Sequence, residues 1–294
     1  MGKILHVIVG PTASGKTHLA IEIATKLQTE IISADARQFY KGMDIGTAKP
    51  SLDELNKVKH YFIDNRLPTD YYSAGDFERD ALSVVKDIFK RKKNVVAVGG
   101  SGLYIKALCE GMDEMPPVDF TYRNELIGKF ETNGISWLQE ELQKLDPEKY
   151  GKIDLNNPQR LMRALEINKQ GVVLSKPKAP RNFEVRKYAI AWERDELYKR
   201  INERVDQMME MGLLKEASQL YEIKECNALQ TVGYTELFDY LDGKTSLDRA
   251  IELIKQHTRN YAKRQITWFK ADPNVHWLLP NELNNLIVNL VQIE

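Results

Sequence analysis

The chain has 294 residues, 43% of them hydrophobic, and its 42 basic and 42 acidic side chains give a formal net charge of +0. That length allows one large domain or one domain with an insertion, and the neutral balance indicates no particular partner. Two cysteines, Cys109 and Cys226, are too few for a disulfide framework, no stretch is long enough for a transmembrane helix, and the N-terminal apolar run is too short for a signal peptide. We therefore expect a cytoplasmic protein with no membrane partner.

The first predicted elements flank a phosphate-binding motif, because the apolar run Ile4–Val9 predicts a buried strand and Leu19–Ala24 predict a helix. Between them, GPTASGKT matches the P-loop pattern G-x-x-x-x-G-K-[ST]. Backbone N–H groups, the helix N-terminus and the Lys16 ammonium would hold a di- or triphosphate, and the Thr17 hydroxyl would hold a phosphate oxygen or Mg²⁺. The alternative is a glycine-rich turn that binds nothing. The predicted phosphate-binding residues are Gly10, Pro11, Thr12, Ala13, Ser14, Gly15, Lys16 and Thr17.

The second predicted strand, Glu30–Ala34, ends at Asp35. Ligands of open α/β sheets bind at the carboxyl ends of the strands, so Asp35 would face a compound held by the P-loop. The alternative is that Asp35 caps a turn, which is a common role of aspartate. The glycine-rich, polar segment Tyr40–Pro50 follows and predicts an ordered functional loop.

The third predicted strand, Asn94–Val98, ends in glycines. A P-loop NTPase normally has a metal-holding aspartate at such a strand end, and its absence here weakens that interpretation. The glycines of Gly99–Gly102 indicate either a backbone that passes close to a ligand, with Ser101 as a hydrogen-bond donor, or a plain turn.

Helical and strand patterns alternate over much of the chain, with a helix predicted at Ser73–Arg91 and further strands at Tyr188–Trp192 and Val275–Leu279. This alternation predicts an α/β fold: a P-loop parallel sheet flanked by helices. Residues 113–182 contain no strand pattern. We predict that they form a helical insertion domain, and that residues 1–112 and 183–294 form the P-loop core. The helices predicted in the insertion are Phe120–Thr132, Ser136–Leu145 and Pro158–Lys169.

After residue 192 the pattern is mostly helical. Arg200 and Arg204 lie four residues apart on one predicted helix, which would either direct one guanidinium into a cleft or pair both with Glu196 or Glu203. The last long helix combines basic and aromatic residues, which suits RNA, although the spacing of its apolar residues also suits a core. The helices predicted here are Asp195–Met211, Leu213–Glu222, Tyr234–Leu241 and Leu247–Lys270.

These segments together resemble one family, the tRNA dimethylallyltransferases, also called tRNA isopentenyl transferases, of the bacterial type. The resemblance covers essentially the whole chain. The matching segments are GPTASGKT, DARQFYKGMDIGTAKP, YSAGDF, VGGSGLY, NNPQRLMRALE, LYKRINERVDQMMEMG, TVGYTE and TRNYAKRQITWFK. This sequence departs from the family at Ala36, where Ser is usual, and at Ser101, where Thr is usual.

The resemblance implies transfer of the dimethylallyl group of dimethylallyl diphosphate to N6 of adenosine-37 in tRNAs that read codons beginning with U. Asp35 would be the general base, and Lys16, Thr17, Arg204 and the cofactor Mg²⁺, bound at Thr17, would hold the diphosphate. Lys176 and Arg264 would contact RNA phosphates. The resemblance implies that the anticodon stem-loop of tRNA contacts Asp35, Ala36, Arg37, Gln38, Ser101, Arg123, Gln159, Arg160, Leu161, Met162 and Arg163. We expect a monomer.

Two other enzymes share the P-loop expectation. A small-molecule kinase would turn over ATP, and an adenine-nucleotide prenyltransferase would act on a free nucleotide. A mononucleotide needs neither the predicted helical insertion nor a basic last helix, which argues against the second alternative. A nucleotide-gated RNA-binding protein without catalysis is a third possibility.

Overall fold

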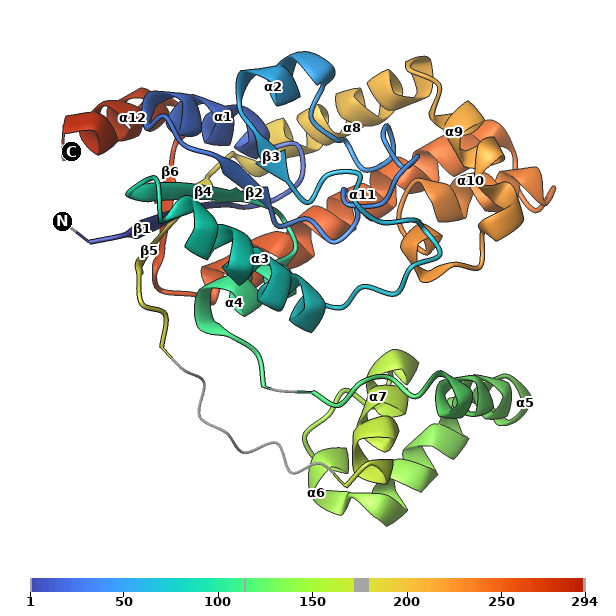
Figure 1. Cartoon of the computed structure of the whole chain (residues 1–294). Helices are drawn as coiled ribbons and strands as arrows, with labels where there is room; N and C mark the ends of the chain where they lie inside the picture. Colours follow the sequence, from blue (N-terminus) through green and yellow to red (C-terminus); the bar gives the residue numbers. More distant parts are fainter. Residues whose placement is uncertain (1, 114, 172–179, 293–294) are drawn as a thin grey trace. The chain divides into compact units, whose positions relative to one another are not determined.

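The computed structural model describes residues 2–113, 115–171 and 180–292. Within these residues, six strands form one sheet in the order β3-β2-β4-β1-β5-β6, and all neighbouring strands are parallel (Figure 1). The strands are β1 (Ile4–Val9), β2 (Ile31–Ser33), β3 (His60–Tyr61), β4 (Asn94–Val98), β5 (Glu184–Ile190) and β6 (Val275–Leu278). The predicted α/β fold with a parallel sheet is confirmed.

Two strands differ from the sequence prediction. Strand β3 was not predicted, because two residues are too short to show a pattern. Strand β5 was predicted at Tyr188–Trp192 but spans Glu184–Ile190. Its first residues include charged side chains that hide the strand pattern, although their backbone pairs with β1. Trp192 lies beyond the strand.

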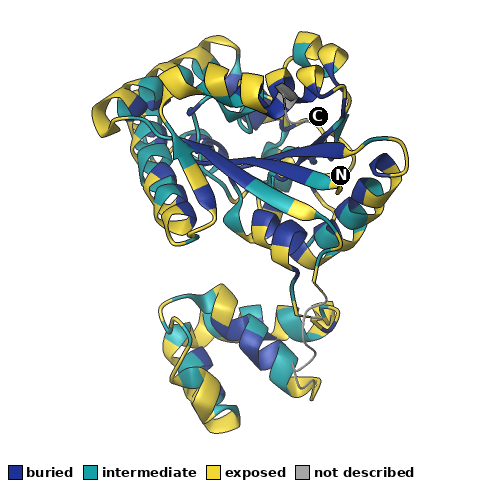
Figure 2. Cartoon of the chain, turned by 90° about the vertical axis from the view of Figure 1, so that its left-hand side faces the viewer, coloured by how far each residue is buried: buried dark blue, intermediate teal, exposed yellow. Residues whose placement is uncertain are grey.

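Helices cover both faces of the sheet (Figures 1 and 2). On one face, α1 and α12 pack against buried residues of β1, β4 and β5, including Ile8, Val96 and Ile190. On the other face, Figure 1 shows α3 and α4 beneath the strands, with α11 running alongside α4. The core helices are α1 (Lys16–Lys26), α2 (Leu52–Lys57), α3 (Ala74–Ile88), α4 (Gly102–Glu110), α8 (Arg194–Glu210), α9 (Leu213–Gln219), α10 (Tyr234–Leu241), α11 (Leu247–Lys270) and α12 (Leu283–Gln292).

Local signals explain where the helices begin. Helix α3 starts with a capping box, in which the Ser73 hydroxyl accepts from the N–H of Asp76 and the Asp76 carboxylate accepts from the N–H of Ser73. Helix α11 begins after Ser246, whose side chain caps it. The bounds of α10 and α11 are those predicted from the sequence. The predicted helix at residues 213–222 is shorter, because α9 ends at Gln219 and a separate 3₁₀ turn follows.

The chain divides into two compact units, Met1–Gly111 with Pro180–Glu294 and, between them in sequence, Met112–Ala179. The second unit contains α5 (Phe120–Leu145), α6 (Pro147–Tyr150) and α7 (Pro158–Lys169), whose buried residues form a core of their own. Helix α5 is broken at Gly134, where φ is 72°, so the two predicted helices lie on either side of that break.

Candidate functional site

The P-loop lies between β1 and the first turn of α1, where Lys16 and Thr17 are the first two helical residues. Gly10 and Gly15 have φ values of 128° and 93°, a conformation that glycine adopts without strain. The Lys16 ammonium donates to the Pro11 carbonyl oxygen at 2.6 Å. In the described part of the chain, the buried Ser14 hydroxyl has no hydrogen-bond partner. A loop with this turn at a helix N-terminus is built to receive an anion.

The charge of Lys16 is strongly influenced by its surroundings. Part of its side chain is exposed, but its amine is enclosed, and this burial lowers the pKa of Lys16 to about 7. The positive charge of Arg204 lowers the pKa further, and the carboxylate of Asp35 opposes both effects. An anion bound in the loop would stabilise the charged ammonium and so offset the effect of burial.

Asp35 follows β2 at the same edge of the sheet. Its Oδ1 atom accepts from the backbone N–H of Arg37 at 2.9 Å and of Gln38 at 3.4 Å, so Asp35 does cap a turn, as one of the two alternatives predicted. Its role toward a ligand stays a prediction. Burial raises the pKa of the Asp35 carboxyl, while those N–H groups and the Lys16 ammonium oppose the shift. The structure thus places a carboxyl group with a raised pKa within electrostatic range of the P-loop lysine.

Helix α8 supplies two further cations to the loop. The Arg200 Nε atom donates to the Ala13 carbonyl at 3.0 Å, and its guanidinium lies 4.3 Å from the centre of the Trp192 ring. An Arg204 nitrogen lies 3.4 Å from the Thr12 hydroxyl. The alternative in which these arginines pair with Glu196 or Glu203 is therefore wrong. Burial, followed by the charge of Arg200, lowers the pKa of Arg204, which again indicates a site prepared for negative charge.

The glycines after β4 make room for the protein itself. A Cβ at Gly99 would overlap the Ala34 carbonyl, at Gly100 the Gln265 amide and at Gly102 the Trp268 ring. The interpretation of these glycines as a close approach to a ligand is therefore replaced by close packing between β4, the end of β2 and α11.

Gln265 is a residue that the sequence analysis missed. It is buried on α11, accepts from the Thr12 N–H at 2.8 Å and donates to the Gly100 carbonyl at 2.8 Å. One amide thus connects the P-loop with the loop after β4. The available signal was its position on the apolar side of α11, between the buried Ala262 and Phe269.

Ser101 connects the two strand ends. Its hydroxyl accepts from the Ala36 N–H at 2.9 Å and lies near the Tyr261 side chain of α11. Burial, followed by the charge of Asp35, raises the pKa of Tyr261 to about 12. Asp35, Ala36, Ser101 and Tyr261 therefore line one small region beside the P-loop.

The sequence matches the model of one family, IPP transferase, over residues 38–272. The chain belongs to this family. A protein from Christiangramia forsetii named tRNA dimethylallyltransferase is 48% identical, over 99% of this chain and 98% of that protein. The crystal structure of the full-length tRNA isopentenylpyrophosphate transferase from Bacillus halodurans has a TM-score of 0.74 and 38% identity, with 100% and 95% of the chains covered. A eukaryotic dimethylallyltransferase acting on tRNA has a TM-score of 0.75 and 26% identity, with 95% and 74% covered.

The second unit of this IPP transferase family member contains most of the remaining predicted tRNA contacts. Arg123 donates to both carboxylate oxygens of the fully buried Glu166, at 2.5 and 2.9 Å, and Arg163 donates to the same carboxylate at 2.9 Å. Two guanidinium groups thus share one buried carboxylate. The prediction that Leu161 and Met162 contact tRNA does not fit their side chains, because both side chains are buried in the core of this unit. Gln159 and Arg160 are exposed on α7.

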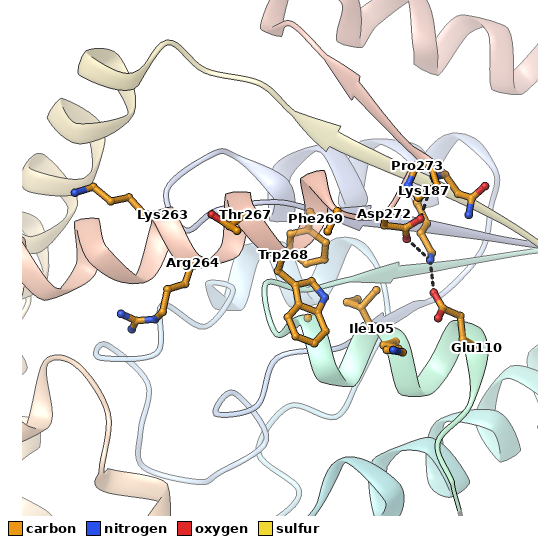
Figure 3. A pocket seen from close by; sticks show the side chains of 14 residues that line it. Ile105, Glu110, Lys187, Lys263, Arg264, Thr267, Trp268, Phe269, Asp272 and Pro273 are labelled. Atoms are coloured by element: carbon orange, nitrogen blue, oxygen red, sulfur yellow. Dashed lines mark hydrogen bonds and ion pairs between the residues drawn. The ribbon is translucent and has the colours of Figure 1, made fainter. Parts of the chain in front are cut away.

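A cavity of about 830 Å³ lies between α4 and the end of α11 in this IPP transferase family member (Figure 3). Trp268, which is 45% exposed, lines this cavity and packs on Gly102. The exposed side chains of Lys106, Lys263 and Arg264 also line the cavity. Figure 3 shows Lys187 at the other end, held by Glu110 at 3.0 Å and Asp272 at 2.5 Å. The predicted phosphate contact Arg264 thus lies beside an exposed aromatic ring, while Lys176 lies outside the described residues.

No helix in the described residues is long and apolar enough to cross a membrane. Residues 2–113, 115–171 and 180–292 also contain no group of three or more His, Cys, Asp or Glu side chains that could hold a metal ion. Cys109 and Cys226 are both free thiols.

Proposed function

We propose that this protein transfers the dimethylallyl group of dimethylallyl diphosphate to N6 of adenosine-37 in tRNAs that read codons beginning with U. The observation that carries this proposal is the position of Asp35, a half-buried carboxylate within electrostatic range of the ammonium of the P-loop residue Lys16. Relatives named tRNA dimethylallyltransferase, such as that of Christiangramia forsetii, support the same reaction.

The P-loop would stabilise the leaving group. When the allylic C–O bond breaks, its electron pair goes to the diphosphate, whose negative charge increases in the transition state. The N–H groups of the loop, Lys16 and Arg204 would stabilise this charge, and electrostatic stabilisation by preorganised donors is usually the largest contribution to lowering such a barrier. The unpartnered hydroxyl of Ser14 fits an additional donor to a phosphate oxygen.

Asp35 would complete the transfer as the general base. The N6 atom of adenine forms the new bond to the allylic carbon and becomes acidic as it does so. Asp35 then takes the proton from N6, which leaves a neutral secondary amine and diphosphate as products. Since burial raises the pKa of Asp35, its carboxylate is a stronger base than an exposed aspartate. The adenine must leave the anticodon stack to reach it, at a cost of a few kcal/mol.

The residues present fit Mg²⁺ as a companion of the diphosphate. Thr17, in the first turn of α1, would offer its hydroxyl oxygen, and Mg²⁺ commonly combines one or two protein oxygens with substrate phosphates and water. When bound, Mg²⁺ would supply positive charge to the leaving diphosphate.

The tRNA anticodon stem-loop would contact the core unit and the helical unit. In the core, the exposed cations Lys106, Lys263 and Arg264 beside the Trp268 ring suit phosphates and a base. In the helical unit, Gln159 and Arg160 are the exposed predicted contacts. A monomeric state and a cytoplasmic location remain predictions.

The test is mass spectrometry of nucleosides from unmodified tRNA incubated with the protein, Mg²⁺ and dimethylallyl diphosphate. We expect a mass increase of one dimethylallyl group on a single adenosine, at position 37, in tRNAs that read U-initial codons. Matched incubations with ATP, and with free adenine nucleotides in place of tRNA, test the kinase and the nucleotide prenyltransferase alternatives. ATP turnover, or modification of the free nucleotide with none of tRNA, would overturn the proposal.

Binding of diphosphate is expected to take up a proton above neutral pH. The pKa of Lys16 is about 7 without a ligand, and a bound diphosphate must raise it because the anion stabilises the ammonium. Calorimetry with inorganic diphosphate at pH 8, in buffers of different ionisation enthalpy, should show up to about one more proton taken up than in Lys16→Arg, whose guanidinium stays charged. Equal proton uptake by the two proteins would show that Lys16 is already protonated in the free enzyme.

A further inference from the structure

Glu216 of α9 has contacts that are unusual for a carboxylate. It is only 9% exposed, and its Oε2 atom accepts from the backbone N–H of Asp44 at 2.9 Å and of Ile45 at 2.8 Å. Its Oε1 atom accepts from the N–H of Gly46 at 2.9 Å and from the Tyr234 hydroxyl at 2.6 Å. Four neutral donors thus surround one side chain, and three of them belong to consecutive residues of the loop after Asp35.

The fit between this loop and its support is close. A Cβ at Gly46 would come within 2.6 Å of the Tyr234 ring, so the loop backbone lies directly on that ring. Tyr234 is fully buried on α10, and its hydroxyl is fixed by Glu216. Residues from α9 and α10, about 170 to 190 positions away in sequence, therefore set the position of residues 44–46.

Hydrogen bonds lead from this loop back to Asp35. The Gln38 amide donates to the carbonyls of Thr47 and Ala48 at 3.2 and 3.0 Å and accepts from the Ser33 hydroxyl at 3.0 Å. The backbone N–H of the same Gln38 is one of the two donors to Asp35 Oδ1. The far end of the loop and the carboxylate are thus joined through one residue.

We propose that Glu216 is a positioning residue that holds Asp35 in its reactive place through the loop of residues 38–48. This inference rests on the proposed function, in which Asp35 is the base. The Glu216 carboxylate is occupied by four donors of the protein, so its effect on Asp35 would pass through the loop. A displacement of the base by about 1 Å can lower a rate about 100-fold, so a residue that fixes the loop contributes through geometry alone.

The test uses the full chain with Glu216→Gln, which keeps the size of the side chain but turns an NH₂ group toward backbone donors. Single-turnover transfer to tRNA should fall about 10- to 100-fold, while the affinity for inorganic diphosphate should stay within about twofold of the wild type, because the P-loop is untouched. Glu222→Gln, on an exposed carboxylate of the 3₁₀ turn Tyr221–Ile223 close by in sequence, is the matched control and should change neither. Equal losses of transfer and of diphosphate affinity in Glu216→Gln would overturn the proposal.

A second readout does not depend on activity. The Asp35 carboxyl can be followed by ¹³C NMR, its signal being assigned by its loss in Asp35→Asn. The N–H groups of Arg37 and Gln38 lower the pKa of Asp35, so a displaced loop should raise the pKa of Asp35 in Glu216→Gln. The other groups that act on Asp35, namely Lys16, Arg37 and Tyr261, remain in the variant.

Tyr234→Phe, which removes only one of the four hydrogen bonds, should shift the Asp35 titration in the same direction by a smaller amount. This variant also covers the case in which Glu216→Gln does not fold. An unchanged Asp35 titration in a folded variant would overturn the proposal. If the wild type itself transfers no dimethylallyl group, the proposed function fails, whereas the titration still decides whether Glu216 positions Asp35.

Discussion

Replacement of Asp35 by Asn is expected to lower the rate of dimethylallyl transfer by about 10²- to 10⁴-fold, the range typical of a lost general base. The amide keeps an oxygen that can accept from the N–H groups of Arg37 and Gln38, so the turn that now holds Asp35 should persist. What is lost is the group that, in the proposed mechanism, takes the proton from N6. The affinity for tRNA should therefore remain within a few-fold of the wild type.

Single-turnover transfer to tRNA and equilibrium binding of labelled tRNA measure the two effects separately. Asp53→Asn, which changes an exposed carboxylate in the first turn of α2, is the matched control and should leave both unchanged. Asp35→Ala should lose transfer to at least the same extent. If transfer and tRNA affinity fell together, Asp35 would be a binding residue, and if transfer stayed within tenfold of the wild type, it would not be the base.

The sheet and the P-loop were predictable because their signals are local. A parallel strand that is buried on both faces forms a continuous apolar run, as in Ile4–Val9 and Asn94–Val98. Strand β5 was predicted too short because Glu184, Arg186 and Lys187 stand in its first half. Lys187 is nevertheless buried, because Glu110 and Asp272 compensate its charge. Partners of that kind, 77 and 85 residues away, cannot be recognised in a local pattern.

In the candidate site, too, local signals were predictable from the sequence and long-range contacts were not. Asp35 and the P-loop were found because they follow strand ends, where ligands of such sheets bind. Gln265 and Glu216 were missed because each is a polar residue that bonds to backbone groups 165 to 253 positions away. In the helical unit, the resemblance indicated the whole run from Gln159 to Arg163. A helix has a buried and an exposed side, and Leu161 and Met162 lie on the side that faces the core.

Replacement of Lys16 by Met is expected to slow catalysis strongly and, at the same time, to stabilise the ligand-free protein. The enclosed ammonium is costly without an anion: its pKa is about 7 instead of 10.5, and each unit of such a shift corresponds to about 1.4 kcal/mol. The variant removes this cost and should unfold at a higher temperature near neutral pH. It also removes a full positive charge from the leaving-group site, so transfer should fall by about 10²- to 10³-fold.

The pH dependence distinguishes this explanation from a general effect of an apolar side chain. Because the folded state of the wild type binds fewer protons at Lys16 than the unfolded state between pH 7 and 10.5, its stability should rise through that window. The stability advantage of Lys16→Met should accordingly be constant below pH 7 and disappear as pH approaches 10.5. Lys26→Met, at the exposed end of the same helix, is the control and should show no such trend. A Lys16→Met protein that is less stable than the wild type, or whose advantage does not change with pH, would show that the ammonium is already compensated in the free enzyme. The P-loop would then not be a strained site that the diphosphate relieves.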